Sequence, residues 1–426
     1  MALERKLIDD CVHCGFCLPA CPTYRSWGNE MDSPRGRIYL MRGLLEREIP
    51  LSDTVVRHFD RCLGCMACVT ACPSGVKYDA LIEGARSEIE ASHARPRFER
   101  WLRALLFALL PYRRRLTALM AVSWLYQRLG LRYLVQRSGI LRRLAPRLAP
   151  LEALLPRVTL RHFFGRVRAR GGAARPVRAR VALLPGCVQG AFFPEVNAAT
   201  VRVLNAEGCD VVVPKGLGCC GALSLHVGRE REAQALARRA IAALEAQNVD
   251  AIVVNAAGCG STMKEWGRLL RDDPAWSQRA AALAARVKDV SELLVELGPR
   301  APRHPLRARA AFHDPCHLAH AQRIRSQPRA LLRAIPELEL LEVEGGDECC
   351  GSAGVYNLLM PESAELIGRR KAEQIGALAP ELLISANPGC TLQIQKCLRA
   401  QGLALGALHP IEALDASIRG VELARR

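Results

Sequence analysis

The sequence predicts a multidomain protein of α+β and α/β structure: a small helical N-terminal domain, a helical connector, and a duplicated α/β domain with parallel strands. Three observations support this prediction. One cysteine pattern occurs twice near the N-terminus, an arginine-rich segment follows it, and short apolar strands then alternate with amphipathic helices in two similar halves. We place the three parts at residues 1–94, 95–175 and 177–426, with the repeats at about 177–300 and 305–426.

The N-terminal part carries two runs with the spacing C-x₂-C-x₂-C-x₃-C-P. The first run is Cys11, Cys14, Cys17 and Cys21, and the second is Cys62, Cys65, Cys68 and Cys72. This is the ferredoxin spacing for [4Fe–4S] clusters, in which the fourth cysteine of each run binds the other cluster. We therefore predict a two-cluster ferredoxin-like domain in which Cys72 completes the first set and Cys21 the second. Zinc also binds C-x₂-C pairs, but its sites rarely use this run of three before C-P, so we favour iron.

The composition favours reduced thiols over a disulfide framework. The 426 residues are enough for two or three domains, and the N-terminal MALERKLIDD lacks the apolar stretch of a signal peptide. The 18 cysteines then suit metal binding in the cytoplasm. No run of 18 uncharged apolar residues occurs, so we expect no membrane-spanning helix.

Positive charge is concentrated in the connector. Positions 95–180 hold 21 arginines, no lysine and two glutamates, a local charge of +19 against +18 for the whole chain. The rest is nearly neutral, so we expect no nucleic-acid partner. Residues 101–110 and 116–127 are apolar and are expected to be helical, and GGAARP at 171–176 is expected to be a flexible joint. The helices suit a membrane interface, a partner groove or packing on this protein's own domains, and the sequence leaves all three open.

The C-terminal part is predicted to be an internal repeat of parallel strands and helices. In the first unit we expect strands at residues 181–186, 210–213 and 251–255 and helices at about 195–207 and 229–247. In the second we expect strands at residues 310–312, 338–343 and 382–385 and a helix near 361–376.

Each repeat contributes four cysteines, and every one of them follows a predicted strand. The first quartet is Cys187, Cys219, Cys220 and Cys259, and the second is Cys316, Cys349, Cys350 and Cys390. The spacing agrees, because 31 and 32 residues separate the first two members, and 38 and 39 separate the last two. Open α/β folds place their binding sites at the carboxyl edge of the sheet. We therefore assign the eight thiols to cofactor binding and treat Cys209 and Cys397 as packing residues.

Several polar residues near these cysteines have two interpretations. His313 and His317 either tune a cluster by hydrogen bonding or simply pack. Arg35 and Arg37 either complement the charge of a cluster or of an acidic patch on a partner, or face solvent. The acidic loop residues either relay protons or are solvated, and we favour solvated carboxylates: Asp314, Asp347 and Glu348. The sequence has no glycine-rich nucleotide fingerprint, so we expect no flavin or nicotinamide site in this chain and place substrate oxidation elsewhere.

The tandem ferredoxin runs followed by two Cys-Cys-Gly units resemble the iron–sulfur subunit of bacterial glycolate oxidase. The resemblance is carried by C-V-H-C-G-F-C at 11–17, C-P-T-Y at 21–24, S-P-R-G-R-I-Y at 33–39 and C-C-G-S-A-G at 349–354. Related chains are a subunit of anaerobic glycerol-3-phosphate dehydrogenase and the cysteine-rich subunit of heterodisulfide reductase. The latter carries a further cysteine in a C-x₂-C, where this sequence has Thr262 and Gln393, which leaves four thiolates in each unit.

This resemblance implies an electron-transfer subunit of a glycolate (2-hydroxy-acid) dehydrogenase complex. Flavin-containing partner subunits would oxidise glycolate to glyoxylate, and this chain would pass the electrons toward a quinone-type acceptor. The implied cofactors are two [4Fe–4S] clusters in the N-terminal domain and one or two further iron–sulfur clusters in the Cys-Cys-Gly domain. The implied location is the cytoplasm, peripheral on the inner face of the cell membrane. The same architecture also serves glycerol-3-phosphate, lactate and heterodisulfide complexes.

Overall fold

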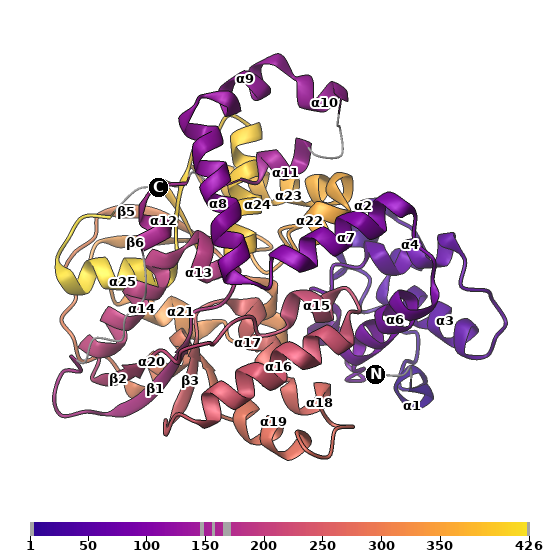
Figure 1. The fold of residues 1–426 in the computed structure, drawn as a ribbon, viewed down its shortest axis with the longest axis horizontal. Coiled ribbons are helices and arrows are strands. Elements are labelled where there is room, and N and C mark those ends of the chain that lie inside the picture. Colours follow the sequence, from indigo (N-terminus) through magenta and orange to yellow (C-terminus); the bar gives the residue numbers. More distant parts are fainter. Residues whose placement is uncertain (1–3, 145–148, 156–157, 165–171, 424–426) are drawn as a thin grey trace.

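The fold was analysed in a computed structural model that describes residues 4–144, 149–155, 158–164 and 172–423. Figure 1 shows a helical N-terminal domain beside an α/β body, with the connector helices running across both. This arrangement confirms the predicted fold class. The boundaries at residues 94 and 175 stay predictions, and Gly171 of the expected joint lies outside the described residues.

The N-terminal domain consists of short helices joined by the cysteine loops. Its elements are α1 (Arg5–Asp9), α2 (Pro22–Trp27), η1 (Glu30–Asp32), α3 (Pro34–Leu45), α4 (Asp53–Arg61), α5 (Ala67–Ala71) and α6 (Tyr78–Ser92). Proline opens α2 and α3, at a position where a helix needs no amide hydrogen. The Ser33 hydroxyl accepts a hydrogen bond from the amide of Gly36 and caps α3. Aliphatic residues of α3, α4 and α6 then form one core around the cysteines.

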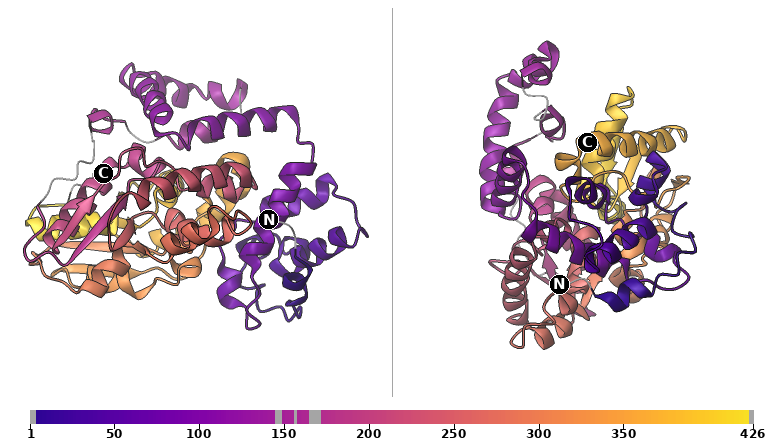
Figure 2. Two further views of the ribbon diagram at one scale, coloured as in Figure 1. Left: turned by 60° about the horizontal axis from the view of Figure 1, so that its bottom comes forward. Right: turned by 90° about the vertical axis from the view of Figure 1, so that its right-hand side faces the viewer.

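The connector is a layer of helices on the outside of the molecule (Figure 2). It contains α7 (Arg97–Leu109), α8 (Arg113–Arg128), α9 (Leu131–Ser138), α10 (Ile140–Leu144), α11 (Ala149–Ala153) and α12 (Arg161–Phe164). One face of α7 is buried through Leu102, Leu106 and Phe107, whereas Trp101 and Leu105 are exposed. Packing on the protein's own domains, one of the three expected roles, therefore explains the buried face of α7 but not its exposed apolar face. Within the described part of the chain, no helix combines the length and apolarity needed to cross a membrane.

The body contains two four-stranded parallel sheets, one in each repeat. The first has the order β2-β1-β3-β4, with β1 (Ala179–Leu184), β2 (Cys209–Val212), β3 (Ala251–Val254) and β4 (Val287–Asp289). The second has the equivalent order β6-β5-β7-β8, with β5 (Ala308–His313), β6 (Leu338–Glu342), β7 (Leu382–Ser385) and β8 (Gly406–Leu408). The central register pairs Val181 with Ala251 and Ala310 with Leu382. The six predicted strands are therefore present, and β4 and β8 add an edge strand to each sheet.

Helices cover both sheets. In the first repeat these are α13 (Val188–Phe192), α14 (Pro194–Ala206), α15 (Ala222–His226), α16 (Glu230–Glu245), α17 (Ala257–Lys264), α18 (Trp266–Leu269), α19 (Ser277–Ala284) and α20 (Val290–Leu297). In the second they are η2 (a π-helix, His317–Ala321), α21 (Ser326–Arg333), α22 (Tyr356–Leu359), α23 (Pro361–Gly376), α24 (Pro388–Ala400) and α25 (Pro410–Arg419).

The two repeats interlock instead of forming independent domains. Helix α14 of the first repeat packs on α25 of the second, and α20 packs on α21. A single hydrophobic core contains residues of both sheets, among them Val181, Phe312 and Ile384. Burying a shared core ties the repeats together, because separating them would expose this apolar surface to water. The cysteine-bearing loops of both repeats are thereby held in fixed positions relative to one another.

Candidate metal centres

The first ferredoxin loop lies nearest the surface. Cys14 is exposed, while Cys11 and Cys17 are partly buried. Burial raises the pKa of the Cys17 thiol to about 11, and the neighbouring Cys11 and Cys21 thiols add to this rise. The Arg35 Nη1 atom donates a hydrogen bond to the carbonyl of His13 at 3.0 Å and so holds this part of the loop in place. Arg35 therefore positions the loop and does not simply face solvent.

The second run is buried in the domain core. Burial raises the pKa of the Cys68 thiol, and the thiols of Cys65, Cys62 and Cys21 raise it further. Cys21 therefore lies close to the second run as well as to Cys17, and the ligand assignments stay predictions. Burial also raises the pKa of Cys62, but the guanidinium groups of Arg37 and Arg86 outweigh it and hold this pKa below its ordinary value.

A buried guanidinium lies beside the second run. The Arg37 side chain is 1% exposed. Its Nε donates to the carbonyl of His58 at 2.7 Å, and its Nη2 donates to Thr23 Oγ1 at 3.2 Å. The fully buried Asp32 carboxylate is 3.7 Å away and also pairs with Arg61. Four thiolates around a cluster make a negatively charged centre, so this cation compensates charge where water does not reach.

The first Cys-Cys-Gly quartet gathers at the carboxyl edge of its sheet. Cys187 follows β1, Cys219 and Cys220 precede α15, and Cys259 lies in α17. The Sγ atoms of Cys187 and Cys219 are 3.6 Å apart. Contact with Cys219 and then burial raise the pKa of the Cys187 thiol. Contact with Cys219 lowers the pKa of the Cys220 thiol, but contact with Cys259 and burial outweigh it and raise this pKa well above its ordinary value. The four thiols thus form one group.

The second quartet has the same arrangement but a more polar surrounding. The ligand atoms of Cys350, Cys390 and His313 lie within 4.8 Å of one another. The Asn387 amide donates to the Sγ of Cys390 at 3.2 Å, and His313 Nδ1 lies 3.1 Å from the Ser385 hydroxyl. In the first repeat, apolar residues occupy the positions equivalent to His313, Ser385 and Asn387: Leu184, Val254 and Ala256. Because hydrogen bonds to cluster sulfurs change the reduction potential, the two quartets form unequal sites.

These thiol groups fit iron–sulfur clusters. All 18 cysteines are free, so they are not disulfides. Their raised pKa values mean that most of the buried thiols would be neutral alone, whereas coordinated iron stabilises thiolates. Backbone amides also point at sulfur, since Gly64 N lies 3.4 Å from Cys62 Sγ and Gly221 N lies 3.4 Å from Cys219 Sγ. Cys209 and Cys397 are buried outside these groups, as expected for packing residues.

The second quartet adjoins the second ferredoxin run. Cys65 packs in one hydrophobic cluster with Cys316 and Cys349, and the Cys316 thiol raises the pKa of Cys65. His317 forms hydrogen bonds on both sides of this junction. Its Nε2 donates to the carbonyl of Gly64 at 3.1 Å, and its Nδ1 accepts from the Ser261 hydroxyl at 2.8 Å. His317 therefore joins the ferredoxin domain to both repeats. The first quartet has no such contact with the second run among the described residues.

The acidic loop residues near the second quartet are paired, and for the buried Asp314 the expectation of a solvated carboxylate was wrong. Asp314 is buried and accepts two hydrogen bonds from Arg329, at 2.7 and 2.6 Å. Asp347 pairs with Arg325 at 2.9 Å, and Glu348 pairs with Arg25 of the N-terminal domain. The arginines that neutralise them come from distant parts of the sequence.

Sequence analysis missed three residues beside the second run. Arg86 Nη1 donates to the carbonyl of His226 at 2.8 Å, and its Nη2 donates to the carbonyl of Cys62. Tyr356 packs with Cys65 and Cys349. No motif contains these residues, and only the folded chain brings them to the cysteines.

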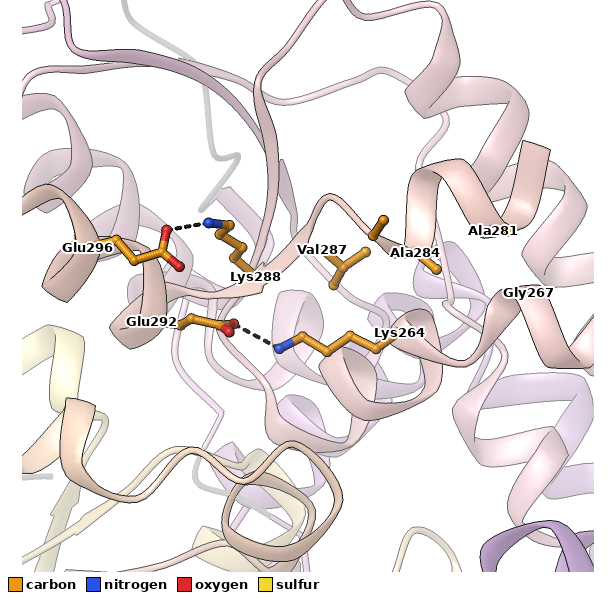
Figure 3. Close-up of a pocket in the computed structure, with 9 residues that line it drawn as sticks. Lys264, Gly267, Ala281, Ala284, Val287, Lys288, Glu292 and Glu296 are labelled. Carbon is orange, nitrogen blue, oxygen red and sulfur yellow. Dashed lines mark hydrogen bonds and ion pairs between the residues drawn. The ribbon is translucent and has the colours of Figure 1, made fainter. Parts of the chain in front are cut away.

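A further cleft of about 570 Å³ beside β4 contains no cysteine (Figure 3). Its charged side chains pair with one another: Lys264 Nζ lies 2.8 Å from Glu292, and Lys288 pairs with Glu296. With its charges neutralised internally, this cleft is a surface groove apart from the metal centres.

Comparison with known protein families matches all three parts of the chain. Residues 7–76 match a 4Fe-4S dicluster domain, and residues 181–264 and 310–395 match a cysteine-rich domain. Residues 98–155 match the linker region of the glycolate oxidase iron-sulfur subunit. These matches support 4Fe-4S clusters in both the N-terminal domain and the repeats.

Individual relatives agree. The chain is 40% identical over 416 residues to the probable glycolate oxidase iron-sulfur subunit of Bacillus subtilis, covering 97% of this chain and 93% of that protein. It is 36% identical to the glycolate oxidase iron-sulfur subunit of Escherichia coli, covering 91% and 90%. A lactate utilization protein A from Exiguobacterium is 29% identical, covering 56% of this chain and 98% of that protein.

Proposed function

This chain belongs to the family of glycolate oxidase iron–sulfur subunits, and from that premise we propose that it carries electrons within a glycolate dehydrogenase complex. Flavin-containing partner subunits oxidise glycolate to glyoxylate, and this chain passes the electrons toward a quinone-type acceptor. The observation that carries the proposal is the grouping of sixteen cysteines into four sets, two of which adjoin at Cys65 and Cys316.

The sixteen cysteines are proposed as cluster ligands. In the N-terminal domain, Cys11, Cys14 and Cys17 act with Cys72, and Cys62, Cys65 and Cys68 act with Cys21. In the repeats, each quartet holds one site. The clusters bound there supply one-electron transfer. The chain itself excludes water from the second run, compensates charge through Arg37, and holds the second quartet against that run through His317.

The exposed first loop is the proposed point of electron entry. Cys14 is exposed, and its neighbours Val12 and Phe16 are 69% and 64% exposed. Apolar side chains that stay in water beside a metal ligand favour covering by a partner protein. We assign this face to a flavin-containing subunit. Electrons then pass inward to the second run, which the second quartet adjoins.

The proposed location is the inner face of the cell membrane, without a spanning segment. Helices α8 and α9 expose apolar side chains, among them Val122, Leu125 and Leu134, beside exposed arginines. Such a surface suits anionic lipid headgroups together with the apolar boundary beneath them. Salt-sensitive binding of the full chain to anionic vesicles tests this location.

A second candidate is the equivalent role in lactate oxidation. The observation that favours it is the similarity of this chain to a lactate utilization protein over 245 residues. That similarity covers about half of this chain, whereas the linker match at residues 98–155 belongs to the glycolate oxidase subunit. We therefore favour glycolate over lactate as the substrate of the complex.

The test is anaerobic affinity purification of the tagged chain from its native cells. We expect flavoproteins to co-purify and to reduce an artificial dye with glycolate. Faster reduction with lactate or glycerol-3-phosphate would keep the electron-transfer role and change the substrate. A purified chain that contains zinc and no iron would contradict the proposal.

A further inference from the structure

A cavity of about 420 Å³ lies where the ferredoxin domain, the connector and the second repeat meet. Residues of α6, α7, α15 and α22 line it, and Figure 1 shows these helices converging around one region. Cys62, a proposed cluster ligand, is part of its wall. Its size falls within the range of small-molecule sites, and the domain junction is a usual place for them.

The wall is mostly apolar. It includes Leu102 of α7, Val227 after α15, and Leu358, Leu359 and Met360 at α22. These side chains favour a ligand with a flat or aliphatic body that leaves water on binding.

The two guanidinium groups of the wall, Arg86 and Arg103, already have partners. Arg86 donates to the carbonyls of Cys62 and His226, and Arg103 Nε donates to Glu99 at 2.9 Å. Arg103 also lies 3.6 Å from Glu90. The charge of Arg86 acts on the Cys62 thiol, whose pKa it lowers, and that of Arg103 acts on Glu99 and Glu90, so both guanidinium groups are already engaged and the cavity favours an uncharged ligand.

Two polar groups remain for such a ligand. The Tyr356 side chain is 6% exposed, and its hydroxyl has no hydrogen-bond partner of normal geometry among the described residues, although Ser363 lies close enough to affect its pKa. The His226 ring also lines the cavity and lies edge-on against His317, with ring centroids 4.7 Å apart. A buried hydroxyl without a hydrogen-bond partner destabilises the folded state, and a ligand that supplies the partner removes this cost.

The cavity also continues onto an exposed apolar surface. Phe98 lines the cavity and packs on Trp101, with ring centroids 6.0 Å apart. Trp101 is 55% exposed, and Leu105 one turn further is 40% exposed. A ligand whose head group binds in the cavity could therefore pack a long aliphatic tail along the exposed apolar surface of α7.

We propose that this cavity is the binding site of a lipid-soluble quinone, with the Tyr356 hydroxyl donating a hydrogen bond to one of the ring carbonyls. The proposal rests on the proposed function, because the electrons come from the 2-hydroxy acid through the partner subunits. One quinone would take up two electrons, supplied one at a time by the cluster that Cys62 would help to hold, together with two protons from water, and would leave as the quinol. The acid loses the same two electrons and two protons as it becomes the 2-oxo acid.

The test is binding of decylubiquinone to the full-length, cluster-containing chain by anaerobic equilibrium dialysis. Its ring is fully substituted and does not alkylate the cysteines. Tyr356→Phe should weaken binding about five-fold, the loss of one hydrogen bond. Leu358→Trp should fill the cavity and abolish measurable binding. Matched controls on exposed surfaces, Tyr39→Phe and Leu366→Trp, should bind like the wild type.

Iron content and EPR signals show whether each variant has kept its clusters. If Leu358→Trp loses iron, the conservative Tyr356→Phe variant decides the question alone. No binding by the wild type, or wild-type affinity in Tyr356→Phe with full iron content, would overturn the site. Glycolate-dependent dye reduction by the wild-type complex separates this outcome from failure of the proposed function, because that activity does not require the cavity.

Discussion

Replacing the buried Arg37 should loosen the N-terminal domain around its second cysteine run. Arg37→Met removes the hydrogen bonds to the carbonyl of His58 and to Thr23, and leaves Asp32 without one of its cations. Breaking a buried ion pair from one side costs about 3–5 kcal/mol, so we expect a loss of about 4 kcal/mol. Arg37→Lys keeps the charge and one of the two hydrogen bonds. Because it loses a single charged hydrogen bond, this variant should lose about 2 kcal/mol.

The assay is the rate at which an iron chelator strips the protein under anaerobic conditions. When chelation follows local opening, this rate scales with the open population, and each 1.4 kcal/mol changes it about ten-fold. Arg37→Met should therefore release iron about 1,000-fold faster than the wild type, and Arg37→Lys about 30-fold faster.

A matched control is Arg42→Met in the same helix, α3. The Arg42 side chain is 36% exposed and pairs with Asp9 at 3.3 Å. An exposed pair contributes about 1 kcal/mol at most, so iron release should accelerate less than about ten-fold. Iron release from Arg37→Met at the Arg42→Met rate would refute the argument that this cation supports the site.

Three further predictions concern other parts of the chain. Burial lowers the pKa of His409 to about 4, and its Nε2 donates to the carbonyl of Asn255 in the other repeat. The free energy of unfolding should therefore be highest above pH 6.5 and fall by about 3 kcal/mol toward pH 4. Urea unfolding as a function of pH measures this fall, which should be smaller in His409→Asn. Asn387→Ala removes the hydrogen bond to Cys390 and should lower one reduction potential in an EPR-monitored titration; unchanged potentials would contradict it. Cys14→Ser should reduce the iron content by one cluster, and an unchanged iron content would contradict that assignment.

The cysteine sets and the strand pattern could be predicted because each depends on local spacing. The C-x₂-C-x₂-C-x₃-C-P runs and the two quartets are written in the sequence, and the six central strands are apolar runs beside amphipathic helices. The edge strands β4 and β8 were missed because each has three residues, too few to establish a pattern.

The surroundings of the cysteines could not be predicted, because distant segments supply them. Arg86 and His226 are 140 positions apart, and His317 reaches Gly64 across 253 positions. Asp314 was expected in solvent because its partner Arg329 belongs to a separate helix, α21. Spacing along the chain therefore identified the thiols, whereas charge compensation and the junction between sites follow from tertiary packing.

The most direct test of the electron-transfer role is freeze-quench EPR of the purified complex after anaerobic addition of glycolate. The account predicts that iron–sulfur signals of this chain appear with glycolate when the flavoprotein partners are present, and do not appear with glycolate when the chain is alone. Flavin reduction without any iron–sulfur signal, in a sample whose clusters dithionite does reduce, would contradict it.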